Sequence, residues 1–179
     1  MLAVCIPPRE HLRPLIIATR DTGLRKSALL SLAWRDIDLE NGLLLIPRGN
    51  RYKRRPKMIA MTVRLRKELE RMSAGADSAS LVFGEIKDFK RSYATACRLA
   101  GIEGLRFNDW RHGFATDLLE AGIPERLAMK AAGHANASTH AIYANLDERI
   151  SRQIAEALDR LHAVRRGDEI PPPSSEMIQ

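Results

Sequence analysis

The sequence has only two cysteines, Cys5 and Cys97, among its 179 residues. Two thiols are too few for the disulfide framework of a small secreted domain or for a zinc site. No apolar run approaches the roughly 20 residues needed to cross a bilayer, and GLLLIP at 42–47 has only the length of a strand. The N-terminal stretch MLAVCIPPREHL lacks the basic leader and long apolar centre of a secretory signal. We therefore expect a soluble, cytoplasmic protein without a membrane partner.

The chain is long enough to bury one hydrophobic core. Its composition, 45% hydrophobic and 28% charged, is typical of a globular domain and not of a disordered chain. No internal repeat is present, and the last residues, GDEIPPPSSEMIQ, have the composition of a flexible tail. We predict one domain over residues 1–166 and a tail over 167–179.

Lysine and arginine outnumber the acidic residues by 29 to 22, which gives a formal net charge of +7. This balance favours an anionic partner, with nucleic acid first and an acidic membrane surface second. The segment RGNRYKRRPK at 48–57 contains no acid and six basic residues, namely Arg48, Arg51, Lys53, Arg54, Arg55 and Lys57. Because Gly49 and Pro56 favour a turn, we predict a basic β-hairpin here. Such a hairpin either reaches into a nucleic-acid groove or is simply a solvated tip.

The apolar spacing predicts a mainly α fold with a small antiparallel sheet, that is, an α+β class. Helical repeats with capping and stop signals predict helices over 10–22, 26–35, 62–73, 86–100 and 108–120, one after Pro124, and a last one opened by Asp147. Asn41-Gly42 predicts a turn into a strand over 43–46, with 57–61 as its partner. Thr62 is the expected N-cap of a helix that contacts the core through Val63, Leu69 and Met72.

The stretch GHANASTHAIYANLD places His134 nine residues before Tyr143. A phenol, with a pKa of about 10, needs positive surroundings to act as a nucleophile. On a phosphodiester, arginines would clamp the non-bridging oxygens and an acid would protonate the leaving alkoxide. Arg25, Lys53 and Arg111 supply such groups elsewhere in the chain. Taken singly, each also has a structural interpretation, as a surface ion, a helix cap or a core residue.

Four stretches together resemble the boxes of the tyrosine recombinases, the phage-integrase and Xer-type family. TGLRKSALLSLAWRDID is similar to the first arginine box, and the basic hairpin matches the position of the family lysine. FNDWRHGFAT is similar to the His-x-x-Arg box, and AGHANASTHAIYANL to the Gly-His box with its tyrosine nine residues later. The resemblance covers roughly Leu12 to Leu161 and implies the tyrosine recombinase catalytic-domain fold.

The resemblance also implies roles for particular residues. Arg25 and Arg111 would clamp the scissile phosphate, and His134 would donate a hydrogen bond to it. Tyr143 would be the nucleophile that forms a 3′-phosphotyrosyl link, with Lys53 as general acid toward the 5′-oxygen. The other basic hairpin residues would contact DNA. Because the phosphotyrosine conserves the bond energy, the resemblance implies neither a metal nor another cofactor.

Double-stranded DNA is the partner that the resemblance implies, in a prokaryotic protein that associates with the nucleoid when it is on DNA. It also implies a tetramer on DNA and a monomer in isolation. The last helix, with Ile150, Ile154, Leu158 and Leu161 on one side, then either closes its own core or docks on a neighbouring subunit. Only 24 residues precede Arg25, too few for the family's N-terminal core-binding domain, which we expect to be absent.

The sequence departs from the family pattern at three positions. Asn108 replaces the first histidine of the His-x-x-Arg box, and an amide donates hydrogen bonds but does not exchange protons near neutrality. If the histidine acts as an acid or base, its loss lowers the rate by ~10²–10⁴, whereas a positioning role would leave Asn108 largely sufficient. His112 is rotated about 100° from Arg111 on a helix, so we do not expect it to substitute. Ala28 replaces a usual glutamate, and AGH lacks the usual leucine before glycine.

Two other functions are compatible with parts of the sequence. One is a DNA-binding module without chemistry, disabled by Asn108 and Ala28. The other is a helix-turn-helix regulator over 122–146, where short helices flank a glycine turn. The regulator hypothesis leaves the other three boxes unexplained, and a module without chemistry has no physical need for the phenol of Tyr143. We therefore favour a DNA strand-exchange enzyme.

Overall fold

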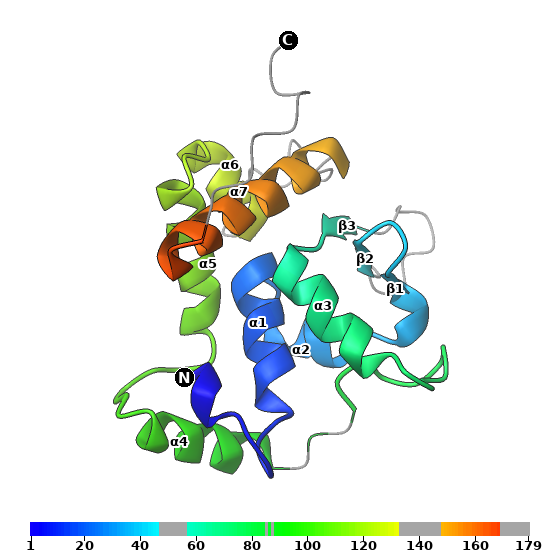
Figure 1. The fold of residues 1–179 in the computed structure, drawn as a ribbon, viewed down its shortest axis with the longest axis vertical. Helices are drawn as coiled ribbons and strands as arrows, with labels where there is room; N and C mark the ends of the chain where they lie inside the picture. The colour runs from blue at the N-terminus through cyan, green and yellow to red at the C-terminus, as the bar shows by residue number, and fades with distance from the viewer. Residues whose placement is uncertain (47–56, 85, 87, 133–147, 169–179) are drawn as a thin grey trace.

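The computed structural model describes residues 1–46, 57–84, 86, 88–132 and 148–168. The described elements are mainly helical, with a three-stranded antiparallel sheet of order β1-β2-β3, which confirms the predicted α+β class (Figure 1). In chain order they are η1 (Leu2–Val4), α1 (Leu12–Thr22), α2 (Lys26–Leu30), η2 (Trp34–Asp36), β1 (Ile37–Asp38), β2 (Leu43–Ile46), β3 (Lys57–Ala60), α3 (Val63–Met72), α4 (Phe89–Leu99), α5 (Asp109–Glu120), α6 (Glu125–Ala132) and α7 (Glu148–Arg166).

Helix α1 lies at the centre of the fold and contacts α2, α3 and α5 (Figure 1). Apolar residues on more than one face of this helix are buried, and Leu12, Leu15 and Ile16 are almost fully so. The helix ends at Gly23, which has φ 64° and donates its N–H to the carbonyl of Thr19 at 2.9 Å. This left-handed C-cap is the one that glycine adopts most readily, and it confirms the predicted helix stop.

The sheet pairs β2 with β3 from Leu43 opposite Ala60 to Ile46 opposite Lys57. Strand β2 has the predicted bounds. Strand β1, which pairs Ile37 with Leu44, was not predicted, because two residues carry too little periodicity to detect. One face of the sheet joins the main core with α1, α2 and α3, and the other places Leu43 and Ala60 against α7.

Two predicted elements differ in detail from the structure. Helix α2 ends at Leu30 and not near residue 35, because the following residues bond to a distant segment: the N–H of Val82 reaches the carbonyl of Leu32 at 2.9 Å. Helix α3 is capped by Thr62 as predicted, with the Thr62 hydroxyl accepting the N–H of Leu65 at 3.3 Å. However, Val63 is 55% exposed, so its predicted core contact is wrong.

Two further clusters complete the core. Phe114 and Leu118 of α5 pack against the alanines of α6 and against Ile154 and Leu158 of α7, as the spacing of the last helix predicted. Helix α4 packs Tyr93 and neighbouring residues against the N-terminal segment and α1. Within the described residues, no helix is long and apolar enough to cross a membrane.

Candidate active site

Arg25 lies two residues after the glycine that ends α1, at the N-cap of α2. Its backbone is extended, with φ −68° and ψ 148°, and the residue is exposed. The sequence TGLRKS determines this placement, because Gly23 stops one helix and Lys26 begins the next. A guanidinium at this corner projects from a helix start and is available to an anion from solvent.

Arg111, in the first turn of α5, is only 8% exposed. Its Nη1 donates a hydrogen bond to the carbonyl oxygen of Gly23. Burial lowers the pKa of Arg111, and the positive charge of Arg25 lowers it further. Two guanidinium groups from distant parts of the sequence are thus brought within electrostatic range of each other. Like charges held together in this way favour a bound anion between them.

Gly23 also permits the close approach of α5 to the end of α1. A Cβ atom added to Gly23 would lie 2.5 Å from Cδ1 and 2.7 Å from Cε1 of Phe114. The ring of Phe114 is 2% exposed and occupies the space that a side chain at position 23 would need. The glycine therefore has two structural roles, the positive φ of the helix stop and the contact that brings Arg111 to Arg25.

Asn108 is the N-cap of α5 and is exposed, three residues before Arg111. Its Nδ2 lies 3.4 Å from Nε2 of His112, one turn further along the helix. The rotation of His112 away from Arg111 does not separate it from Asn108. Residues four apart share a helix face, so the spacing of Asn108 and His112 in the sequence already indicates this contact.

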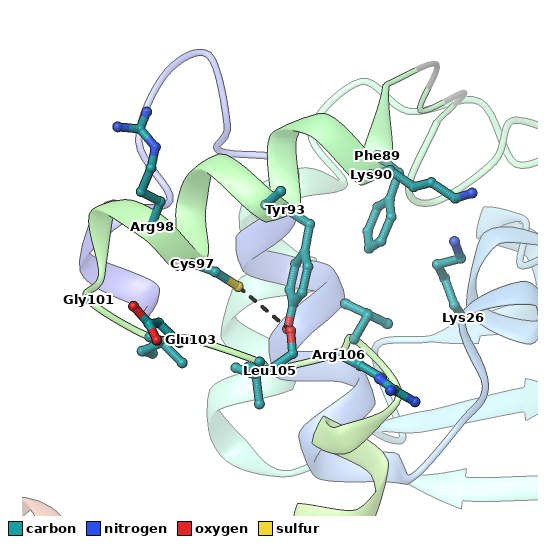
Figure 2. A pocket seen from close by; sticks show the side chains of 14 residues that line it. Lys26, Phe89, Lys90, Tyr93, Cys97, Arg98, Gly101, Glu103, Leu105 and Arg106 are labelled. Carbon is teal, nitrogen blue, oxygen red and sulfur yellow. Dashed lines mark hydrogen bonds between the residues drawn. The ribbon is translucent and has the colours of Figure 1, made fainter.

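An open pocket of about 780 Å³ lies between α4 and the loop over residues 101–107 (Figure 2). Its lining includes Lys26 and Phe107, the sequence neighbours of Arg25 and Asn108. Phe89, Tyr93 and Phe107 give it aromatic walls that contact one another edge-to-face or by stacking. Its basic lining residues are Lys26, Lys90, Arg98 and Arg106, and Glu103 is its acidic one. Nζ of Lys26 lies 4.3 Å from the centroid of the Phe89 ring, which holds the ammonium over this aromatic wall.

The structure thus brings together two of the predicted site residues, Arg25 and Arg111, and places Asn108 at the start of the helix that carries Arg111. Lys57 begins β3 opposite Ile46 and is half-buried. The other predicted residues lie outside the described ranges; they are Arg48, Arg51, Lys53, Arg54, Arg55, His134 and Tyr143. Ala28, half-buried against the core, stands one turn after Arg25 where the family usually has glutamate. In the described part of the chain, no three acidic, histidine or cysteine side chains gather as a metal site would require.

Solved structures of integrases and recombinases share this fold. The crystal structure of a XerA recombinase matches with a TM-score of 0.62 at 18% identity, over 94% of this chain and 62% of that chain. The integrase of mycobacterium phage Brujita matches with a TM-score of 0.62 at 19% identity, over 89% of this chain and 54% of that chain. The Tn1549 transposon integrase, solved in complex with a circular intermediate DNA, matches with a TM-score of 0.61 at 18% identity, over 88% and 62%. These likenesses confirm the predicted catalytic-domain fold.

Sequence relatives point to the same family. The chain is 31% identical over 156 residues to tyrosine recombinase XerA of Thermococcus kodakarensis, which covers 80% of this chain and 54% of that protein. It is 29% identical over 161 residues to tyrosine recombinase XerC of Xanthomonas axonopodis pv. citri, covering 84% and 50%. The chain therefore spans about half the length of these curated relatives. The phage integrase family matches residues 4–149, and the chain belongs to this family.

Proposed function

We propose that the chain cleaves and rejoins double-stranded DNA through a covalent link to Tyr143. The observation that carries this proposal is the buried guanidinium of Arg111, held on the carbonyl of Gly23 and within electrostatic range of Arg25. Two guanidinium groups held near each other raise the local positive charge and favour an anion bound between them. A phosphate of the DNA backbone has the charge and the oxygen geometry that two guanidinium groups bind.

In the proposed reaction the phenol oxygen of Tyr143 attacks the phosphorus and loses its proton. The bond from phosphorus to the 5′-oxygen breaks, and a 3′-phosphotyrosyl link forms. Lys53 donates a proton to the departing 5′-oxygen. Attack by the 5′-hydroxyl of another strand then releases Tyr143 and rejoins the backbone. The number of phosphodiester bonds is conserved, so no nucleotide cofactor is consumed.

Stabilisation of the transition state is assigned to Arg25, Arg111, His134 and Asn108. The two guanidinium groups neutralise charge on the non-bridging oxygens, where it concentrates as the phenol adds. His134 and Asn108 each donate a hydrogen bond to the same phosphate. Asn108 does so without a titratable proton, so its contribution is positional.

The DNA partner is supported by basic groups close to the boxes in the sequence. Lys26, which follows Arg25, and Arg106, two residues before Asn108, line the pocket together with Lys90. Together with the predicted hairpin contacts, Arg48, Arg51, Arg54, Arg55 and Lys57, they would hold the phosphate backbone. Affinity dominated by such contacts falls steeply with salt. We further propose that the chain is a monomer in isolation and forms a tetramer on DNA.

The proposal is tested with a pool of random-sequence duplexes that carry a nick close to the site of cleavage. When a short fragment diffuses away after cleavage, the protein stays attached to DNA and migrates as a larger species in denaturing gels. The wild-type chain is expected to form this adduct and Tyr143→Phe is not. Tyr52→Phe and Tyr93→Phe are matched controls that remove the other two phenols and are expected to retain it. An adduct that survives in Tyr143→Phe contradicts the proposal.

A DNA-binding protein without chemistry is the second candidate, favoured by Asn108 and Ala28. It predicts that the wild-type chain binds duplex but forms no adduct. Asn108→His separates an attenuated enzyme from a fully active one. A gain of ~10²-fold or more in the rate of adduct formation indicates that the natural amide limits the reaction. No gain indicates that the amide suffices.

A further inference from the structure

Asn108 occupies a helix N-cap but does not use its side chain as a cap. Asparagine is among the best N-cap residues, and the hydrogen bond of its side chain to the first turn contributes about 1 kcal/mol. Here the backbone is in the αR region, with φ −67° and ψ −20°, and the side chain makes no capping hydrogen bond. Because its side chain does not cap the first turn, the amide of Asn108 is left for other contacts.

The contact it makes is with His112, through Nδ2 and Nε2 at 3.4 Å. Both side chains are exposed, so the pair lies at the surface beside Arg111 and not in the core. On a helix, Asn108 lies between the directions of Arg111 and His112, at about 60° from the first and 40° from the second. The directions of the arginine and of the imidazole thus lie on opposite sides of Asn108.

The two hydrogens of the amide nitrogen point in different directions. When Nε2 of the neutral imidazole accepts one of them, the proton of the ring is on Nδ1 and the amide plane is fixed. The second hydrogen then remains available to an oxygen on the side of Arg111. Without the imidazole, the side chain rotates freely, and a phosphate would have to order it at a cost in conformational entropy.

We propose that His112 is a positioning residue for Asn108, which it orients as a hydrogen-bond donor to the phosphate held by Arg25 and Arg111. The pair, amide and imidazole, thereby replaces the single histidine that the family has at position 108. This inference rests on the proposed function for the identity of the phosphate as a DNA phosphate. In this proposal His112 acts on the phosphate through Asn108.

The kinetic test measures the rate of adduct formation on the nicked duplex pool. His112→Ala is expected to lower the rate roughly 10-fold, less than the loss of a whole donor, with the melting temperature and duplex affinity unchanged. His112→Gln, whose amide oxygen accepts the same hydrogen, is expected to remain within about 3-fold of wild type. Thr116→Ala is the matched control: its exposed hydroxyl donates to the backbone carbonyl of His112 at 3.3 Å and not to the imidazole, so its removal is expected to have no effect.

Coupling to Asn108 decides whether His112 acts through it. In an Asn108→Ala chain, His112→Ala is expected to lower the rate by less than about 2-fold, because the group that it orients is gone. A 10-fold loss of rate from His112→Ala in the Asn108→Ala chain would overturn the proposal. So would a wild-type rate in His112→Ala alone, or a His112→Gln chain as slow as His112→Ala.

A second readout does not depend on catalysis. In ¹⁵N NMR spectra, inorganic phosphate is expected to shift the side-chain NH₂ resonances of Asn108 in wild type and to shift them less in His112→Ala. Sodium chloride at equal ionic strength is the control. If the wild-type chain forms no adduct, the proposed function fails while this titration still tests the pair. Equal phosphate shifts in both chains, or none in either, would overturn the positioning role.

Discussion

The guanidinium of Arg111 donates a hydrogen bond to the carbonyl oxygen of Gly23, across 88 residues of sequence. Because Gly23 ends α1 and Arg25 begins the turn into α2, this contact fixes one arginine relative to the other. The relative position of the two arginines is set by backbone geometry and by the packing of Phe114 on Gly23, since the two cations themselves repel each other. The spacing of the proposed phosphate clamp is therefore a property of the core.

Gly23→Ala is expected to lower the free energy of unfolding by about 3 to 4 kcal/mol. The left-handed backbone contributes about 1 kcal/mol of this, and the overlap of the new methyl with the Phe114 ring the rest. Urea denaturation measures the change. The same substitution is expected to slow adduct formation, because the ring and Arg111 lie on the same helix.

Gly101→Ala is the matched control for this substitution. Its φ of 65° is close to the 64° of Gly23, but nothing lies within 4 Å of an added Cβ. We expect it to lower the free energy of unfolding by only about 1 kcal/mol. Equal losses in the two variants would show that Phe114 does not restrict position 23.

Gly113, on α5, is expected to tolerate a methyl group only when Arg20 is removed. An added Cβ would lie 1.7 Å from Nη1 of Arg20, whose Nε and Nη2 bind the fully buried carboxylate of Asp117 at 2.6 and 2.7 Å. Gly113→Ala alone should displace Arg20 and lower the free energy of unfolding by about 2 to 4 kcal/mol, since it weakens a buried ion pair.

In an Arg20→Ala chain the same Gly113→Ala substitution is expected to be neutral or to stabilise by up to about 1 kcal/mol, because alanine favours helix over glycine. Arg165, at 2.8 Å from Asp117, keeps the carboxylate paired in that background. Urea denaturation of the four chains gives the coupling. Additive effects of the two substitutions would contradict the steric explanation.

Local signals predicted the elements that lie close to the site. Gly23, Thr62 and the strand over 43–46 were each predicted from residues within a few positions, and the structure has them where they were expected. The predictions were wrong where contacts with distant segments determine the local structure. Helix α2 stops early because the residues after it bond to a segment near Val82. At the start of α3, the N–H of the exposed Val63 is bound by Asp159 of α7, 96 residues away.

In the candidate site, too, local motifs were informative and contacts between distant segments could not be predicted. Motif order identified Arg25, Asn108 and Arg111, but not the carbonyl of Gly23 as the acceptor that joins two boxes. The contact between Asn108 and His112 follows from helical spacing, because residues four apart lie on the same face of a helix. The pairing of Arg20 with Asp117 joins residues 97 apart, and no local pattern marks either of them.

The pH dependence of stability is expected to contain two opposing contributions from α7. Burial raises the pKa of Asp159 to about 6, above its unfolded value of about 3.9, so its stabilising contribution is present below pH 4 and lost as pH rises through 6. Burial lowers the pKa of His162 to about 4, below its unfolded value of about 6.5. Its contribution is present above pH 6.5 and lost as pH falls through 4.

Single substitutions should separate these contributions, each of which amounts to about 3 kcal/mol. Relative to wild type, Asp159→Asn should lose stability as pH falls from 6.5 to 4, because only His162 then opposes folding in acid. His162→Leu should instead lose stability, relative to wild type, as pH rises from 4 to 6. Urea denaturation at pH 4, 5, 6 and 7 measures both slopes. Parallel curves for all three chains would contradict the assignment.

The most direct test of the phosphotyrosine mechanism is mass spectrometry of the trapped adduct after digestion with nuclease and trypsin. Cleavage after Lys130 and Arg149 releases AAGHANASTHAIYANLDER, which contains Tyr143 as its one tyrosine. We predict that this peptide carries the residual nucleotide mass and that fragmentation places it on Tyr143. A nucleotide on Ser138 or Thr139, on a peptide that contains Tyr52 or Tyr93, or on no peptide at all would contradict the account.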